Sequence, residues 1–229
     1  MHQFDFVKGE VILIDKPYDW TSFDVVNKIR TLIKYHLGIK KIKMGHAGTL
    51  DPLATGLLIL CSGSFTKKID EYQGKEKEYI GTIMLGATRP SSDMETEIDK
   101  TFNTNEIRDE DIINVAKSFI GEIKQIPPLF SAKKICGERA YEFARKGIDM
   151  QMEAKDVSIS EFEITKIILP EVNFRVICSK GTYIRSLARD FGEKLNNGAY
   201  LSQLCRTRIG EFNLNQALNM EKIEELIKQ

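Results

Sequence analysis

Residues 43–58, "KMGHAGTLDPLATGLL", constrain the fold of this 229-residue chain more than any other stretch does. Glycines, among them Gly45 and Gly48, and a proline, Pro52, surround one acid, Asp51, and an apolar run follows at once. Glycine permits tight turns and the close approach of another backbone, and proline restricts its own φ and the conformation of the residue before it. The stretch therefore predicts an acid held rigidly in a loop beside a core strand. Such an acid could act as a nucleophile or base, although on the local sequence alone an Asx-turn that closes a loop is the favoured interpretation.

The composition fits a folded protein without a membrane segment. Hydrophobic residues make up 42% of the chain, which is enough for a core, and no apolar run approaches the roughly 18 residues of a membrane helix. The N-terminus lacks the basic and then apolar order of a signal peptide, so a cytoplasmic protein is expected. Four scattered cysteines form no C-x-x-C pair, so neither disulfides nor a metal site is expected.

The net charge of zero hides strong local segregation. Residues 27–46 hold six cations and no acid, residues 174–208 hold seven cations against two acids, and residues 91–111 hold eight acids. Such segregation could build a positive surface for a polyanion such as RNA. It could equally reflect solvated helix faces, and charge alone leaves both interpretations open.

Hydrophobic periodicity predicts strands and helices in irregular alternation, which favours an α+β fold with a mixed sheet. Thr21 and Asp24 have the spacing of a capping box at the start of the first helix. Residues 125–148 break the pattern, because two prolines stand near their start and aromatic residues alternate with basic ones. This suits a surface excursion over a site, and a packed loop and helix is the alternative. Strands are expected at 10–17, 57–60, 77–86 and 172–180, and helices from the capping box to about 35, over 112–120, from 182 to about 195, and at about 220–228.

Three single residues have both a functional and a structural interpretation. Arg185, at the start of a predicted helix, could form an ion pair with a distant carboxylate or remain a solvated helix charge. Tyr79, in a predicted strand, could stack on an extruded base or pack in the core. His46 could insert into a nucleic-acid loop or merely cap a turn.

Five stretches in order along the chain resemble the TruB family of tRNA pseudouridine synthases. The first two are "LIDKP" and "GHAGTLDPLATGLL", followed by "KEYIGTIMLG" and "PPLFSAKKICGERAYEFARKGI", and the last is "CSKGTYIRSLARDFGEKLNNGAYLSQLCRTRIG". Together they cover the chain from residue 11 to about 212. The resemblance implies a single catalytic domain over residues 1–229 with a mixed, largely antiparallel sheet of the pseudouridine synthase type, flanking helices and an RNA-clasping thumb at about 125–148.

The resemblance also implies the roles of individual residues. Asp51 would be the essential acid and Arg185 its salt-bridge partner, while Tyr79 would stack on the target uracil. His46 would fill the space left in the RNA when bases are extruded. The remaining site residues would be Leu204, which lines the uracil pocket, Lys16 and Pro17, which shape the site, and the thumb cations Lys133, Lys134, Arg139 and Arg145.

The implied reaction is the isomerisation of a uridine in the TΨC loop of tRNA, at tRNA position 55, to pseudouridine. The base must leave its stack, which costs a few kcal/mol that contacts to the displaced loop repay. Asp51 could attack C1′ or C6, or act as a base at C2′, and the sequence leaves these routes open. No cofactor and no metal are expected; the partner would be the T-arm stem-loop of tRNA, with no membrane and no obligate protein partner, and the protein would be a monomer.

Two departures from the family pattern qualify this expectation. Arg89 and Pro90 stand in a turn that is usually acidic and threonine-rich, although Asp93 at its end is retained. The chain also ends without room for the C-terminal RNA-binding PUA domain of many relatives, so that domain is expected to be absent. The alternatives are a non-catalytic RNA-binding or RNA-folding module, a guide-RNA-dependent relative, and a hydrolase with paired carboxylates, for which no second acid is placed near Asp51.

Overall fold

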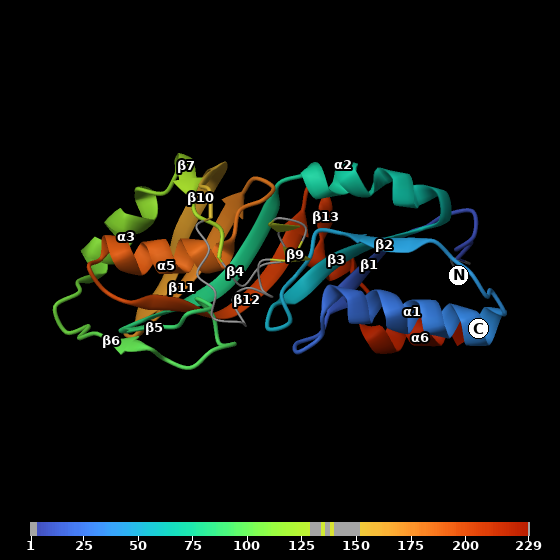
Figure 1. The fold of residues 1–229 in the computed structure, drawn as a ribbon, viewed down its shortest axis with the longest axis horizontal. Helices are drawn as coiled ribbons and strands as arrows, with labels where there is room; N and C mark the ends of the chain where they lie inside the picture. The colour runs from blue at the N-terminus through green and yellow to red at the C-terminus, as the bar shows by residue number, and fades with distance from the viewer. Residues whose placement is uncertain (1–3, 129–133, 136–137, 140–151, 229) are drawn as a thin grey trace. The chain divides into compact units, whose positions relative to one another are not determined.

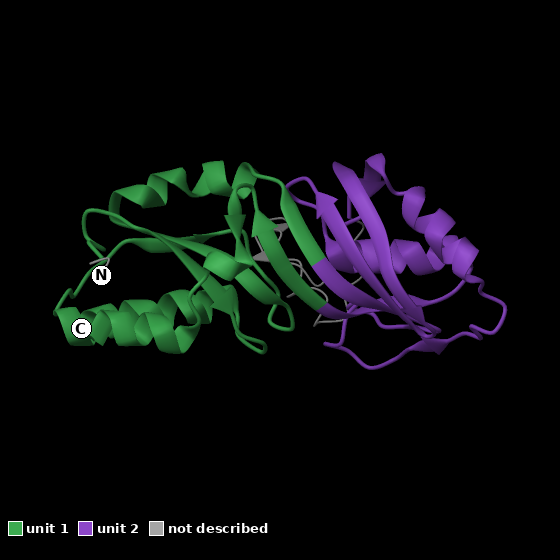
Figure 2. Ribbon diagram, turned by 180° about the vertical axis from the view of Figure 1, so that it is seen from behind, with its two compact units in different colours: residues 1–79, 204–229 green, residues 80–203 purple. Residues whose placement is uncertain are grey.

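The structure is a computed structural model that describes residues 4–128, 134–135, 138–139 and 152–228 (Figure 1). The chain divides into two compact units (Figure 2). Unit 1 comprises residues 1–79 and 204–229, and unit 2 comprises residues 80–203. The chain passes from one unit to the other within strand β4 (Lys77–Leu85) and returns within strand β12 (Ala199–Ile209).

Unit 1 is organised around β3 (Thr55–Ser62), an apolar strand whose residues 57–61 are fully buried. Strands β1 (Val11–Lys16) and β2 (Met44–Ala47) both pair with β3 in the antiparallel sense. Strand β1 lies on one edge of β3; on the opposite edge, beyond the residues that pair with β2, β3 pairs in parallel with the C-terminal part of β12, which also pairs with β13 (Phe212–Asn213). A continuous apolar run is typical of such a strand, because both of its faces are covered.

Helices α1 (Ser22–Leu37) and α6 (Met220–Lys228) lie side by side in unit 1 (Figure 1). Thr21 and Asp24 form the predicted capping box, and Gly38 ends α1 in the left-handed conformation. Apolar residues at helical spacing on both helices pack on β1 and β3 as one core. A short 3-10 turn, η1 (Gly63–Lys68), and helix α2 (Ile69–Gly74) follow β3.

In unit 2 the strand order is β4, β11 (Glu171–Cys178), β10 (Lys155–Ile168) and β7 (Gly121–Gln125). Strand β10 is antiparallel to both β11 and β7. Helices α3 (Asp109–Lys117) and α5 (Ile184–Lys194) contribute to a core with four phenylalanine rings in contact. The smaller strands are β5 (Ala87–Thr88) paired with β6 (Lys100–Thr101), and β8 (Lys134–Ile135) paired with β9 (Glu138–Arg139).

The α+β expectation, with a mixed and largely antiparallel sheet, is confirmed. The helix expected over 112–120 is found as α3, which ends at Lys117; of the apolar residues in that range Ile112, Ala116 and Phe119 are buried, whereas Ile113 and Ile120 are 39% and 48% exposed. The prediction of one catalytic domain stays a prediction. Among the helices that the structure describes, none has both the length and the apolar character needed to cross a membrane.

Candidate active site

The loop that carries Asp51 joins β2 to β3 in unit 1, and glycine is required at one position in the loop and at one in β3 just after it. Gly48 has φ +91° and Gly56 has φ +101°, in a region that other residues rarely adopt. A Cβ on Gly56 would lie 2.4 Å from the carbonyl oxygen of Arg206 in β12, so only glycine lets the two strands approach this closely. Asp51 itself is half-buried, and its carbonyl accepts a hydrogen bond from the Ala54 N–H at 3.1 Å.

Three buried side chains hold the backbone of this loop. The Arg206 guanidinium donates from Nε to the Leu57 carbonyl (2.8 Å) and from Nη2 to the Gly48 carbonyl (3.0 Å). The Ser22 hydroxyl accepts from the Leu50 N–H at 2.9 Å. The Lys16 ammonium donates to the carbonyls of Pro52 (3.2 Å), Trp20 (2.6 Å) and Pro17 (2.8 Å). The backbone is therefore fixed both before and after Asp51.

Lys16 is a buried cation with an altered proton affinity. Its side chain is fully buried, and burial lowers the pKa of Lys16 from 10.5 to about 8. The negative charge of Asp51 opposes this shift, and the nearby positive charge of Arg206 adds to it. Two buried cations of unit 1, Lys16 and Arg206, thus lie beside the Asp51 loop, and backbone carbonyls accept hydrogen bonds from both.

Unit 1 also contains most of the other residues that were expected at the site. His46 lies in β2 opposite Leu60, and its Nδ1 makes no hydrogen bond with a described residue. Burial, and then the charge of Arg206, lowers the pKa of His46, which favours the neutral imidazole. The Leu204 carbonyl lies 3.4 Å from the Thr55 hydroxyl at the start of β3, and Tyr79 in β4 is 7% exposed.

Arg185 lies in unit 2, at the first turn of α5, and is buried rather than solvated. Its Nε lies 3.5 Å from Oδ2 of Asp93, and its Nη1 donates to the Ser91 carbonyl at 3.4 Å. Both charged side chains are less than 10% exposed. Arg185 is thus ion-paired within its own unit, and its pairing with Asp51 stays a prediction.

The turn with Arg89 and Pro90 still places Asp93 in contact with Arg185. The Ser91 hydroxyl lies 2.9 Å from the Thr96 hydroxyl and 3.2 Å from the Asp93 carbonyl, which closes the turn on itself. The Arg89 guanidinium lies 4.7 Å from the centre of the Tyr200 ring, a cation–π arrangement. The departure from the family pattern therefore preserves the buried acid.

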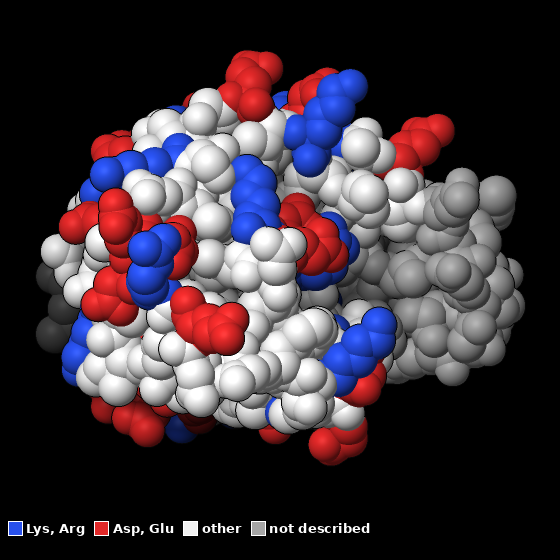
Figure 3. Space-filling view, turned by 90° about the vertical axis from the view of Figure 1, so that its left-hand side faces the viewer, with Lys and Arg blue, Asp and Glu red and all other residues white. Residues whose placement is uncertain are grey.

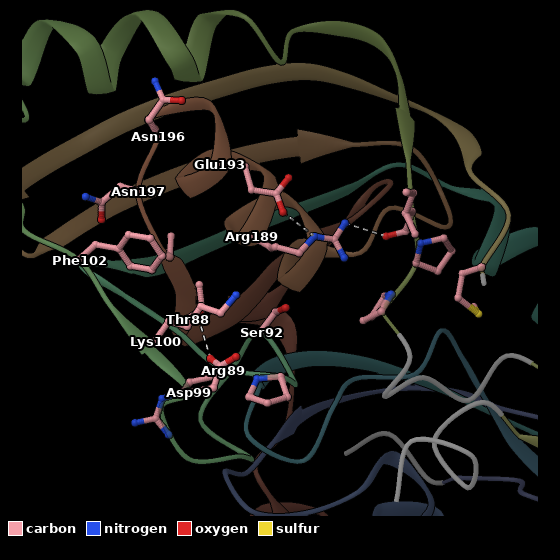
Figure 4. A pocket seen from close by; sticks show the side chains of 16 residues that line it. Thr88, Arg89, Ser92, Asp99, Lys100, Phe102, Arg189, Glu193, Asn196 and Asn197 are labelled. Carbon is pink, nitrogen blue, oxygen red and sulfur yellow. Dashed lines mark hydrogen bonds and ion pairs between the residues drawn. The ribbon is translucent and has the colours of Figure 1, made fainter. Parts of the chain in front are cut away.

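The same turn forms one wall of a cavity of about 830 Å³ in unit 2 (Figure 4). Arg189 and Glu193 of α5 lie on another wall, and a hydrogen bond of 2.7 Å joins Thr88 to Asp99. Among the described residues that line this cavity, none was expected to carry the chemistry.

The two basic segments differ in the structure. In residues 174–208 two of the five arginines are buried and the other three form ion pairs with nearby acids, so the arginines of this segment add little uncompensated positive charge to the surface. Figure 3, which shows the side on which α3, α5 and β6 lie in Figure 1, has Lys and Arg interspersed with Asp and Glu. In residues 27–46, by contrast, Lys28 pairs with Glu224 at 3.3 Å, whereas five cations make no ion pair with a described acid: Arg30, Lys34, Lys40, Lys41 and Lys43.

Only part of the predicted thumb can be placed. Lys133 and Arg145 lie outside the described residues. Lys134 and Arg139 are register partners in the β8–β9 pair. Within the described part of the chain, no group of three or more His, Cys, Asp or Glu side chains could hold a metal ion.

Two residues that hold the Asp51 loop, Arg206 and Ser22, could not be recognised from the sequence. Arg206 and Arg208 both lie on β12, and nothing in the local sequence distinguishes the buried Arg206 from Arg208, which pairs with Glu76 at 3.0 Å. Ser22 has the sequence context of an ordinary first residue of a capped helix. Both are recognisable only once β12 and α1 are placed beside the loop.

Comparisons with known proteins identify the family to which this chain belongs. The model of the TruB family pseudouridylate synthase N-terminal domain matches residues 34–184, and that of the tRNA pseudouridylate synthase B C-terminal domain matches residues 185–229. A tRNA pseudouridine synthase B of Phocaeicola vulgatus is 55% identical over 225 residues, which is 98% of this chain and 96% of that protein. A second, of Flavobacterium johnsoniae, is 54% identical and covers 98% of both chains.

Two solved structures of complexes contain a chain with the same fold. A Cbf5–Nop10–Gar1 complex matches 96% of this chain with a TM-score of 0.71 and 29% identity. An H/ACA RNP bound to a substrate RNA containing 2'-deoxyuridine matches 95% with a TM-score of 0.68 and 27% identity. The chain spans about half of those two solved chains, 54% and 53%. The class is thus a pseudouridylate synthase, and the chain belongs to the TruB family.

Proposed function

We propose that this protein is a tRNA pseudouridine synthase that isomerises the uridine at position 55 in the TΨC loop. The observation that carries the proposal is the loop of Asp51, anchored by Arg206, Ser22 and Lys16, in a chain 55% identical to a tRNA pseudouridine synthase B. Binding alone would not need an acid whose backbone is fixed on both sides.

In this proposal Asp51 is the residue that acts on the target nucleotide, and Arg185 is its ion-pair partner. Tyr79 stacks on the uracil, His46 occupies the space left by the extruded bases, and Leu204 lines the uracil pocket. Lys16 and Pro17 shape the loop. The N1–C1′ bond breaks and a C5–C1′ bond forms, so N1 gains a proton and C5 loses one to solvent. The substrate and product are isomers, and no redox equivalent is consumed.

RNA binding in this proposal uses the exposed cations of residues 30–43 and the thumb. A neutral His46 suits insertion among bases, because an imidazolium would have to lose its hydration on entering the RNA. The closer similarity to tRNA-modifying relatives, 55% against 29% for the Cbf5 complex, favours action on tRNA without a guide RNA.

The proposal is tested with purified protein and an unmodified T-arm stem-loop labelled with tritium at uridine C5. Release of tritium to water reports the loss of the C5 proton. The wild type and Asp15→Asn, which alters an exposed acid on β1, should both release tritium. Asp51→Asn should lose activity by at least about 10³-fold while retaining RNA binding. Equal activity of Asp51→Asn, or a requirement for a second RNA, would contradict the proposal.

A further inference from the structure

The strongest unassigned feature of unit 1 is Arg206, a buried cation whose described hydrogen bonds go to backbone carbonyls. Arg206 is 1% exposed and is one of the largest fully buried side chains of the structure. We propose that Arg206 is a positioning residue: it fixes the loop that presents Asp51, without itself contacting the substrate. This inference rests on the proposed role of Asp51.

The geometry of Arg206 links the loop to the core strand. The parallel register of β12 and β3 sets Arg206 opposite Gly56. From there its Nε reaches the carbonyl of Leu57 in β3, and its Nη2 reaches the carbonyl of Gly48, three residues before Asp51. A planar guanidinium can hold two acceptors at a fixed separation, so the position of Gly48 is set relative to the rigid strand.

A second buried cation acts on the other side of the same acid. Lys16 donates to the carbonyl of Pro52, the residue directly after Asp51. The Asp19 N–H donates to this carbonyl as well, at 3.0 Å. Between the two cations, the Ser22 hydroxyl binds both the N–H and the carbonyl of Leu50, at 2.9 and 3.1 Å. The loop is thereby held at three points along its length although it forms no regular secondary structure.

Stability alone does not account for this arrangement. Removing two cations from water is unfavourable, and well-packed apolar side chains of similar size often stabilise a fold as much or more. Buried cations that bind loop carbonyls instead fix one loop conformation among several. A displacement of about 1 Å at a reacting group can reduce a rate by about 10²-fold, so such precision matters for an acid that acts on a nucleotide.

The test compares Arg206→Lys with Arg206→Met and with the control Arg208→Lys on the same strand. Lysine keeps the charge but is a single point donor, so it cannot hold the Leu57 and Gly48 carbonyls as the guanidinium does. Single-turnover tritium release from the T-arm stem-loop gives the rate of the chemical step. A titration of RNA binding gives Kd, and near-ultraviolet circular dichroism gives the folded fraction.

We expect the single-turnover rate of Arg206→Lys, per folded molecule, to fall about 10- to 100-fold, with Kd within about threefold of the wild type. Arg206→Met should be slower still, and Arg208→Lys should match the wild type. Hydrogen exchange at the amides of Leu50 and Ala54 should speed up in Arg206→Lys, because both amides lie in the loop that Arg206 holds. If Arg206→Met does not fold, Arg206→Lys decides the outcome.

Three results would overturn the inference: a wild-type rate in Arg206→Lys, a loss confined to Kd, or a loss that follows only the folded fraction. Failure of the proposed function looks different. There the wild type would release no tritium, or Asp51→Asn would remain active. If the wild type is active, Asp51→Asn is inactive and Arg206→Lys is unimpaired, the positioning role alone is excluded.

Discussion

Two turns of this protein present an aspartate, and they hold it in opposite ways. In unit 1 the loop of Asp51 is anchored through its backbone, by side chains that bind the carbonyls of Gly48 and Pro52. In unit 2 the turn of Asp93 is closed by its own hydroxyl groups, and the carboxylate is committed to Arg185 at 3.5 Å. Asp51 is half-buried, whereas Asp93 is buried.

The difference separates an acid whose described anchors bind the carbonyls of neighbouring residues from an acid whose own carboxylate takes part in the described ion pair. The anchors of the first turn fix where Asp51 lies through the backbone. Asp93 compensates a buried guanidinium, and an unpaired cation there would be strongly unfavourable. If this distinction is correct, the two turns should respond differently to substitution.

Gly56→Ala should have the largest effect on stability, because it disturbs the close packing of β3 against β12 next to the Asp51 loop. The new Cβ would lie 2.4 Å from the Arg206 carbonyl oxygen, and the alanine would have to adopt φ +101°. Backbone strain and overpacking together should lower the free energy of unfolding by about 4 kcal/mol. Denaturant titration measures this directly.

Gly121→Ala provides the matched control for that prediction. Gly121 has φ +110°, and no atom of a residue that the structure describes lies within 4 Å of the point that a Cβ would occupy, so Gly121→Ala introduces backbone strain without a steric clash. Gly121→Ala should lower the free energy of unfolding by about 1 kcal/mol. Equal losses in the two variants would show that close strand approach at Gly56 is unimportant.

The sequence predicted the acid loop but not what anchors it. The glycines and Pro52 identified Asp51 because turn chemistry is local, and Thr21 with Asp24 fixed the start of α1 for the same reason. The anchors are not local: Arg206 lies 158 residues from Gly48, and Lys16 lies 36 residues from Pro52. Arg185 was recognised, yet its pairing with Asp93 depends on how α5 packs beside a distant turn. The charge of residues 174–208 left two interpretations open, because a sum of charges does not show that Arg185 and Arg206 are buried or that the other arginines are ion-paired.

Asp93→Asn should have the next largest effect. It leaves the buried Arg185 without the ion pair described within unit 2, which should lower the free energy of unfolding by about 3 kcal/mol. Thermal unfolding followed by circular dichroism checks this, with Glu97→Gln as an exposed control on the same segment. A loss below about 0.5 kcal/mol in both variants would mean that Arg185 is compensated without Asp93.

Lys16→Met should change how stability depends on pH. Because burial lowers the pKa of Lys16 to about 8 in the folded state, the unfolded chain binds this proton more tightly. The unfavourable burial of the charge is therefore fully present below pH 8 and disappears as the pH rises toward 10.5. Relative to Lys16→Met, the wild type should gain about 2 kcal/mol between about pH 7 and about pH 9.5.

That comparison is made by denaturant titration of both proteins at several pH values. Other lysines, tyrosines and cysteines titrate in both proteins, so their contributions cancel in the difference. A difference that does not change with pH would show that Lys16 keeps an ordinary pKa in the folded protein.

The smallest effect is expected for the exposed cations that follow α1, which lie outside both turns. Lys40, Lys41 and Lys43 are exposed, and replacing all three with Gln should weaken tRNA binding about tenfold and lower the slope of log Kd against log salt by about 2 to 3. The matched control replaces three exposed lysines of unit 2, Lys124, Lys155 and Lys166, and should leave that slope unchanged. Because these contacts bring the tRNA to the enzyme and do not orient Asp51, the single-turnover rate at saturating RNA should stay within about twofold of the wild type. A drop in that rate without a change in the salt slope would place these lysines in the catalytic step, and the division between holding the acid and holding the RNA would then fail.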